Sequence, residues 1–135
     1  MQGPAPQQLE AEDLARVVAS VGAAAGPIAF SSLCALPAWT QTDVARRFFG
    51  VYRASRAEAC RAAPAAIAEQ IAAFLPEVTR PALEATIVAY QALGTWASDD
   101  AISADLFERS VDIFVQAGYL TARPKFEDVV AAPPV

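Results

Sequence analysis

The sequence predicts an α/β fold in which one or two strands precede about four helices. Residues 28–36 carry no charge and are bordered by Pro27 and Pro37, which is typical of a buried strand. From Thr40 to Gly118 the apolar residues instead recur every three or four positions, which indicates amphipathic helices. Uncharged strands suit a sheet covered on both faces, and an isolated hairpin is marginal in water. We therefore expect these strands to belong to a larger α/β domain.

The segment before this strand is open to two interpretations. Five apolar residues within residues 9–27 fit one face of a helix: Leu9, Leu14, Val17, Val18 and Val21. The β-branched run at residues 16–21, closed by Gly22, fits a short buried strand equally well. Residues 1–8 are expected to form a flexible leader.

The first predicted helix begins at Thr40 and ends before Pro64. Thr40 and Asp43 have the spacing of a capping box, and the acid is also favourable at the positive end of a helix. Residues at spacings of three and four form its apolar stripe: Val44, Phe48, Val51, Tyr52, Ser55 and Ala59. The arginines are expected on the other side: Arg46, Arg47, Arg53, Arg56 and Arg61.

Three more helices are predicted to follow. Each begins at a proline or a capping side chain and ends at a proline or a glycine. They run from Pro64 to Pro76, from Thr79 to Gly94, and from Ser103 to Gly118. Their expected apolar stripes are Ile67, Ile71 and Phe74, then Leu83, Ile87 and Tyr90, then Phe107, Val111 and Phe114.

Composition argues against several kinds of chemistry. The net charge of −5 argues against a general nucleic-acid binder, which needs a basic surface to neutralise phosphates. The chain has no His, which excludes Ser-His and Cys-His catalysis and His-ligated metals. A Schiff-base enzyme would depend on Lys125, the single Lys. Cys34 and Cys60 could pair, but we expect two buried free thiols.

Three segments occur in an order that resembles a known family. They are residues 16–36, the helix that begins at Asp43, and residues 90–130. The last is the most specific, because it combines Leu-Gly-x-Trp (93–96), two acids, Ile-Ser, Phe-Glu-Arg (107–109), Gly-Tyr-Leu and Arg-Pro-x-Phe-Glu-Asp (123–128). Together, over roughly residues 9–131, they resemble the C-terminal part of periplasmic substrate-binding proteins of ABC importers. The branch is the nitrate, sulfonate, taurine or thiamine-precursor type, whose domain is shared with thiamine pyrimidine-precursor synthases.

The resemblance implies part of a two-lobed, type II-like periplasmic-binding-protein fold that closes on a small solute. Residues 9–27 would end the second lobe, residues 28–36 would be a crossover strand, residues 37–131 would complete the first lobe with helices, and residues 132–135 would be a tail. It also implies no cofactor, an ABC permease as partner, and a periplasmic or membrane-anchored extracytoplasmic location. The start of the chain lacks the basic and apolar pattern of a signal peptide, so a cytoplasmic location is expected if this is the complete product. Because a cleft needs both walls, we do not expect this chain alone to bind solute tightly.

Two groups of residues are candidates for binding. Phe30, Ser31 and Ser32 would lie at a strand end near the hinge, where hydroxyls, backbone N–H groups and a ring could orient a small anion or heterocycle. The alternative is a buried strand whose hydroxyls are satisfied internally. Three arginines could dock an acidic partner such as a transporter subunit, or could form an ordinary solvated face: Arg46, Arg47 and Arg53.

No catalytic residue or metal ligand is predicted. Adjacent acids such as Asp99 and Asp100 point apart and do not make an acid/base pair. Trp96 and Tyr90 could stack a planar ligand, but packing at the corner between two helices is the simpler interpretation.

Three functions follow from these observations. The first is a solute-binding component, or a truncated remnant of one, for an ABC importer of a small organic or anionic solute. The second is an enzyme similar to the pyrimidine-precursor synthases, which the lack of His and of a Cys-rich motif disfavours. The third is a non-catalytic helical interaction protein that forms oligomers through an exposed sheet edge.

Overall fold

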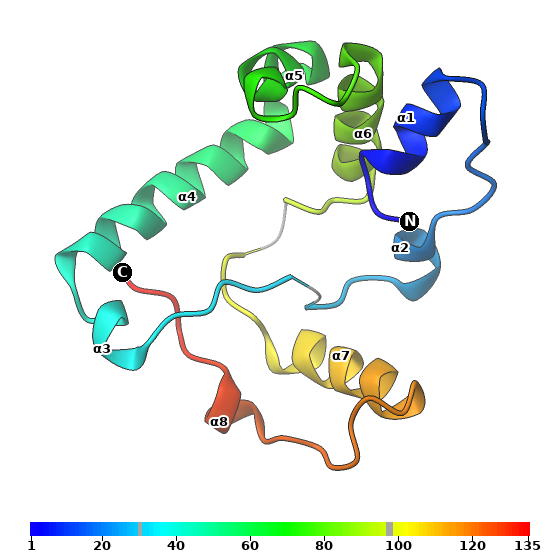
Figure 1. The fold of residues 1–135 in the computed structure, drawn as a ribbon. Helices are drawn as coiled ribbons and strands as arrows, with labels where there is room; N and C mark the ends of the chain where they lie inside the picture. The colour runs from blue at the N-terminus through cyan, green and yellow to red at the C-terminus, as the bar shows by residue number, and fades with distance from the viewer. Residues whose placement is uncertain (30, 97–98) are drawn as a thin grey trace. The chain divides into compact units, whose positions relative to one another are not determined.

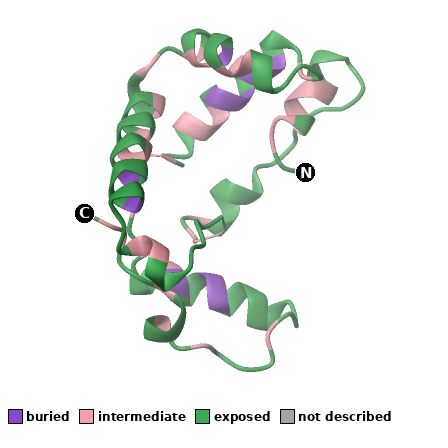
Figure 2. Cartoon of the chain, turned by 60° about the vertical axis from the view of Figure 1, so that its left-hand side comes forward, coloured by how far each residue is buried: buried purple, intermediate pink, exposed green. Residues whose placement is uncertain are grey.

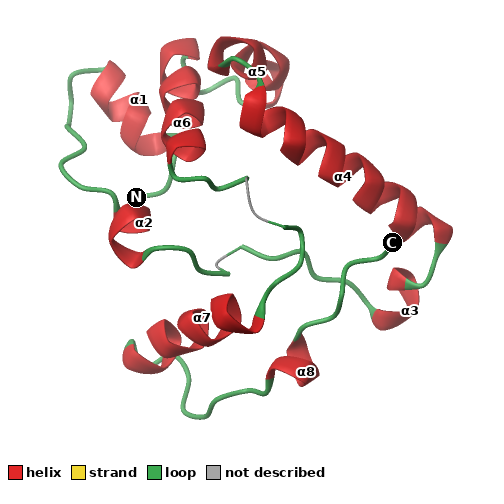
Figure 3. Ribbon diagram, turned by 180° about the vertical axis from the view of Figure 1, so that it is seen from behind, coloured by secondary structure: helices red, strands yellow, loops and turns green. Residues whose placement is uncertain are grey.

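The computed structural model describes residues 1–29, 31–96 and 99–135. Every regular element in these residues is helical, and none of them forms a strand (Figure 3). Figure 1 shows the order of the helices along the chain. The chain divides into two compact units. Unit 1 is Met1–Ala24 with Ala54–Ser98, and unit 2 is Ala25–Arg53 with Asp99–Val135.

The predicted α/β class is wrong for the described residues. Residues 31–36 form an irregular, exposed segment in which Leu33 and Leu36 are 54% and 77% exposed. In the alternative strand at residues 16–21, Val18 is 94% exposed. A strand is stable only when a neighbouring strand pairs with its backbone and other elements cover its side chains, and the described residues supply no such neighbour. The expected sheet edge for oligomerisation is therefore also absent from the described part of the chain.

Within the described residues, three helices of unit 1 carry a proline in their first turn. The elements of this unit are α1 (Ala5–Ala11), α5 (Pro64–Ile71), the 3₁₀ turn η1 (Ala72–Phe74) and α6 (Arg80–Ala92), together with most of α2 (Val21–Ala25) and the end of α4 (Asp43–Arg61). The prolines lie in α1, α5 and α6, at positions where the missing N–H has no helical partner to lose. Residues 5–8, expected in a flexible leader, belong to α1 instead, and α1 packs against α6.

A small apolar core holds unit 1 together. Ala68, Leu83 and Ile87 are at most 3% exposed and contact one another. The predicted stripe of α6 is thus confirmed at Leu83 and Ile87. The predicted stripe of the preceding helix is wrong at Phe74, which is 81% exposed because the chain winds into the 3₁₀ turn η1 before reaching it.

Two glycines end helices as predicted. Gly94 has φ of 67° after α6, and the N–H of Thr95 donates to the carbonyl of Tyr90 at 3.1 Å. Gly118 has φ of 76° after α7 (Ala104–Gln116), and the N–H of Tyr119 donates to the carbonyl of Phe114 at 2.9 Å. Both are left-handed helix ends that favour glycine, since other residues carry a Cβ that is strained there.

Unit 2 contains α3 (Pro37–Thr40), the first part of α4, α7 and α8 (Phe126–Val129). Ser103 caps α7 as predicted, because its hydroxyl accepts the N–H of Leu106 at 3.3 Å. Phe107 is 8% exposed, and its ring contacts Phe126 edge to face with centroids 5.5 Å apart. The same face of α7 binds the segment after α2, because the hydroxyl of Ser110 accepts the N–H of Ala29 at 2.9 Å.

The residue that caps α4 lies two positions later than predicted. The hydroxyl of Thr42 accepts the N–H of Ala45 at 3.2 Å and caps the helix, whereas Thr40 ends α3. The division between the two units falls within this 19-residue helix, after Arg53. Within the described ranges, no helix is both long enough and apolar enough to cross a lipid bilayer.

Candidate functional site

Helix α4 exposes three large apolar side chains to solvent. Val44, Phe48 and Val51 are 65%, 44% and 67% exposed, whereas Ala45 and Phe49 on the neighbouring face are 0% and 9% exposed. In Figure 2, α4 is green over most of its length, with a purple band near its beginning. The predicted apolar stripe of this helix is therefore wrong as a core-facing surface. We call Val44, Phe48 and Val51 the α4 stripe.

The covered face of α4 is turned about 100° from the predicted one, which is the angle of one residue around the helix. Both Ala45 and Phe49 follow a stripe residue by one position. The covered side also takes in Arg53 and Arg56, which are half-buried. Burial of these arginines is tolerated because each guanidinium has hydrogen-bond partners, Arg56 donating to the carbonyl of Trp96 at 3.4 Å.

Arg53 is anchored to other residues of unit 2 by several contacts. Its Nε donates to Oδ2 of Asp100 at 2.7 Å, and its Nη2 donates to the carbonyl of Pro134 at 2.9 Å. The guanidinium carbon lies 5.7 Å from the centroid of the Phe49 ring, within range of a cation–π contact. These contacts bind the Arg53 guanidinium to other residues of unit 2. Docking of an acidic partner by Arg53 would therefore compete with Asp100 for the same guanidinium.

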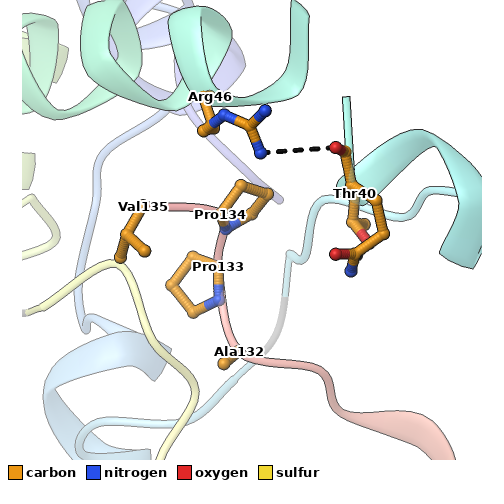
Figure 4. A pocket seen from close by; sticks show the side chains of 7 residues that line it. Thr40, Arg46, Ala132, Pro133, Pro134 and Val135 are labelled. Atoms are coloured by element: carbon orange, nitrogen blue, oxygen red, sulfur yellow. Dashed lines mark hydrogen bonds between the residues drawn. The ribbon is translucent and has the colours of Figure 1, made fainter. Parts of the chain in front are cut away.

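Arg46 and Arg47, the other two predicted docking residues, are both exposed. Arg46 forms an ion pair with Asp43, and its Nη1 donates to the carbonyl of Gln41 at 3.3 Å. It borders a hollow of about 220 Å³ in unit 2, lined also by Thr40, Gln41 and residues 132–135 (Figure 4). Arg47 has no ion-pair partner among the residues that the structure describes. Docking of an acidic partner by these two arginines stays a prediction.

Aromatic contacts hold Phe48 at the edge of the α4 stripe. Its ring stacks on Tyr52 with centroids 6.2 Å apart and planes 7° apart. It also meets Trp39 and Phe49 edge to face at 5.9 Å and 5.5 Å. Such pairs are worth about 0.5–1.5 kcal/mol beyond burial of area. One face of Phe48 is thus packed within unit 2 while the rest remains accessible.

The predicted ligand-facing residues do not lie at a strand end. Ser31 and Ser32 are exposed, and they lie in the irregular segment before α3. The thiol of Cys34 lies 3.9 Å from the carbonyl of Ser32, a weak contact for a sulfur donor. Phe30 falls outside the described residues. A ligand-facing role for Phe30, Ser31 and Ser32 stays a prediction without the strand on which it was based.

The acids after Trp96 take part in local structure. The N–H of Ala101 donates to Oδ1 of Asp99 at 3.2 Å and lowers the pKa of Asp99, with smaller contributions from Asp100 and from the charge of Arg53. Asp100 is engaged by Arg53. Elsewhere, the hydrogen bond to Glu69 is the main cause that raises the pKa of Arg80, and the hydrogen bond to Glu108 does the same for Arg123.

Trp96 packs as the corner residue of unit 1. Its side chain contacts the core of Ala68, Leu83 and Ile87, and its ring meets Tyr90 edge to face at 5.8 Å. The two rings are inclined by 72° to each other, so they do not form the parallel walls that stack a planar ligand. Corner packing, the simpler of the two interpretations, describes this contact.

Both cysteines are free thiols as expected, but Cys34 and Cys60 are exposed and not buried. No group of three or more Cys, Asp or Glu side chains in the described ranges could hold a metal ion. Comparisons with protein-family models, with curated proteins and with solved structures find no match to this chain. The α4 stripe, which its periodicity assigned to the core, is therefore the exposed feature from which a function can be inferred.

Proposed function

We propose that this chain is a non-catalytic helical interaction protein that binds another protein through the exposed face of α4. The observation that carries this proposal is the exposure of Val44, Phe48 and Val51 at positions i, i+4 and i+7 of one 19-residue helix. This spacing is the one by which amphipathic helices place anchors against a partner. Because the stripe adds little to the core of its own chain, it is available for intermolecular contact.

Association through this face would be driven by burial of apolar area. Fully burying a Val or Phe side chain is worth about 1.5–3 kcal/mol. Small residues lie beside the stripe at Gly50, Ala54 and Ser55, all of them exposed. A Cβ added at Gly50 would meet nothing within 4 Å. The backbone of a partner element can therefore approach α4 closely along this side.

The proposal is tested by comparing neighbouring substitutions on α4. In the double variant Val44→Asp/Val51→Asp we expect the free energy of unfolding to change by less than about 1 kcal/mol, because both side chains are exposed. Fluorescence of the apolar dye 8-anilinonaphthalene-1-sulfonate should fall. In the matched control Ala45→Asp, a charge is buried, and a loss of more than about 3 kcal/mol is expected. Urea titration followed by circular dichroism measures both.

An equal loss of stability in the double variant and in Ala45→Asp would refute the proposal. The stripe would then belong to the folded core, and no face of α4 would be left for a partner. Unchanged dye fluorescence in a stable double variant would likewise place the accessible apolar surface elsewhere.

The second candidate function is the solute-binding component of an ABC importer, with an extracytoplasmic location. The ordered sequence string that ends in residues 90–130 favours it. Isothermal titration calorimetry with taurine, nitrate and a pyrimidine thiamine precursor tests it on this chain. Micromolar binding would support the solute role, and no heat at millimolar solute would leave the α4 face as the better-supported function.

A further inference from the structure

We infer that the partner of the α4 face is a second copy of this chain, with the two α4 helices packed antiparallel about a two-fold axis near Tyr52. This inference rests on the proposed function and identifies the partner that would bind the α4 face. It follows from the way charges are placed along the helix, which is self-complementary only in the antiparallel arrangement.

Four charged residues follow one flank of the α4 stripe. Asp43 and Arg61 are eighteen residues apart, which is five full helical turns, so they lie at the same angle around the helix. Arg47 and Glu58 are eleven residues apart, about three turns, and lie within about 20° of each other. All four are exposed. Along this flank the order of charges is therefore acid, base, acid, base.

The charges are arranged symmetrically about Tyr52. Asp43 and Arg61 each lie nine residues from it, and Arg47 and Glu58 lie five and six residues from it. In an antiparallel helix pair, the same flank of each helix faces the other, and positions equally distant from the axis meet. Asp43 would then face Arg61 of the second copy, and Arg47 would face Glu58, giving four opposite-charge contacts.

A parallel pair has no such complementarity. In a parallel pair, the charged flank of one helix faces the opposite flank of the other, so Arg47 would not meet Glu58 of the second copy. Both acids of α4, Asp43 and Glu58, lie on the charged flank, so the opposite flank offers no carboxylate to Arg47 or Arg61. The order of charges thus selects the antiparallel arrangement of a second copy.

Small and apolar residues lie where the helices would cross. Val51 is one residue from the axis, and Ala54 and Ser55 follow on the exposed side. Close approach at the crossing point is therefore not blocked by a large side chain on this face. Val44 and Phe48 would extend the apolar contact toward either end.

The ion pairs within the helix do not prevent this arrangement. Glu58 contacts Arg61 at 2.7 Å, with side chains 52% and 71% exposed, and exposed pairs of this kind are worth about 0–1 kcal/mol. Exchange of partners between the copies therefore costs little. An interface of one helix a side is small among specific interfaces, so an affinity in the micromolar range is expected.

A charge exchange between Arg47 and Glu58 tests the arrangement. Sedimentation velocity of the full chain over a wide micromolar range should show concentration-dependent dimerisation. Either single variant, Arg47→Glu or Glu58→Arg, places like charges opposite each other, and the two-fold axis repeats this contact twice in the dimer. Each should raise the dimer dissociation constant by about 10-fold. The double variant Arg47→Glu/Glu58→Arg restores opposite charges. Its dimer dissociation constant should return to within about 3-fold of that of the parent chain. Failure of the double variant to recover would overturn the antiparallel register.

Introduced cysteines give a second, geometric readout. In a Cys34→Ser/Cys60→Ser background, Val51→Cys lies beside the axis and should form a covalent dimer on mild oxidation. Val44→Cys is the matched control, an exposed Val that lies eight residues from the axis, so its two copies would be about 24 Å apart along the helix. Efficient cross-linking of Val44→Cys, or none of Val51→Cys, would contradict the arrangement.

The two proposals fail in different ways. If the chain stays monomeric at all concentrations while Val44→Asp/Val51→Asp remains stable and loses dye binding, the second copy is refuted and the α4 face still stands as an interaction surface. If that double variant unfolds, the face itself is refuted, and the second-copy inference falls with it.

Discussion

Replacing Leu83 with alanine should destabilise unit 1 by about 3 kcal/mol. Leu83 is 2% exposed and contacts Ala68 and Ile87, which are 0% and 3% exposed. The substitution removes three carbon atoms, worth about 0.8 kcal/mol each in transfer free energy, and leaves a cavity that adds to this loss. Partly buried neighbours such as Ile67 and Ile71 can move inward, which places the value toward the lower end of the range for buried leucines.

Urea titration with tryptophan fluorescence measures this change. A Trp39→Phe background leaves Trp96 as the single tryptophan, and Trp96 contacts the core that the substitution disturbs. With an m-value of about 1–2 kcal/mol/M, the midpoint should fall by roughly 1.5–3 M. Leu14→Ala is the matched control in the same unit, because Leu14 is 70% exposed, and its effect should stay within about 0.5 kcal/mol.

Two outcomes would refute this reasoning. A loss below about 1 kcal/mol for Leu83→Ala would mean that Leu83 is not in a packed core. Equal losses for Leu83→Ala and Leu14→Ala would mean that burial does not determine stability in this unit.

Two further predictions concern unit 2. Ser103→Ala removes the acceptor for the N–H of Leu106 and should cost about 1 kcal/mol by thermal unfolding, whereas Ser103→Asp should retain most of the stability; equal losses would contradict the cap. Because the pKa of Asp99 is lowered in the folded chain, its stabilising contribution is present at neutral pH and is lost as the pH falls below the ordinary Asp pKa of about 3.9. Asp99→Asn keeps an acceptor for Ala101 but removes the charge, so stability should depend less on pH between about 4 and 2 than in the parent chain, and an unchanged profile would contradict this assignment.

Helix ends were predictable where the cause is local. Pro64 starts α5, Ser103 caps α7, and Gly94 and Gly118 follow the ends of α6 and α7. A proline has no N–H, a capping hydroxyl reaches three residues along the chain, and glycine adopts positive φ without strain. None of these effects needs a distant partner, so a single sequence is enough to read them.

The candidate site was predicted only in part, because it depends on distant contacts. The residues of the α4 stripe were identified as one apolar face, but that face was assigned to the core. Periodicity shows that apolar residues share a face and not what covers it. Arg53 was placed on the solvent side because its partner, Asp100, lies 47 residues away in sequence.

The strand prediction failed for a related reason. The segment at residues 28–36 has the composition of a buried strand, but a strand also needs a neighbour for its backbone hydrogen bonds, and composition does not supply one. By itself, the sequence determined where α5 and α7 begin, where α6 and α7 end, and which α4 residues share a face. Only the tertiary structure decided that Ala45 and Phe49 are covered while Val44 and Val51 remain exposed, because burial depends on which segments meet across long stretches of chain.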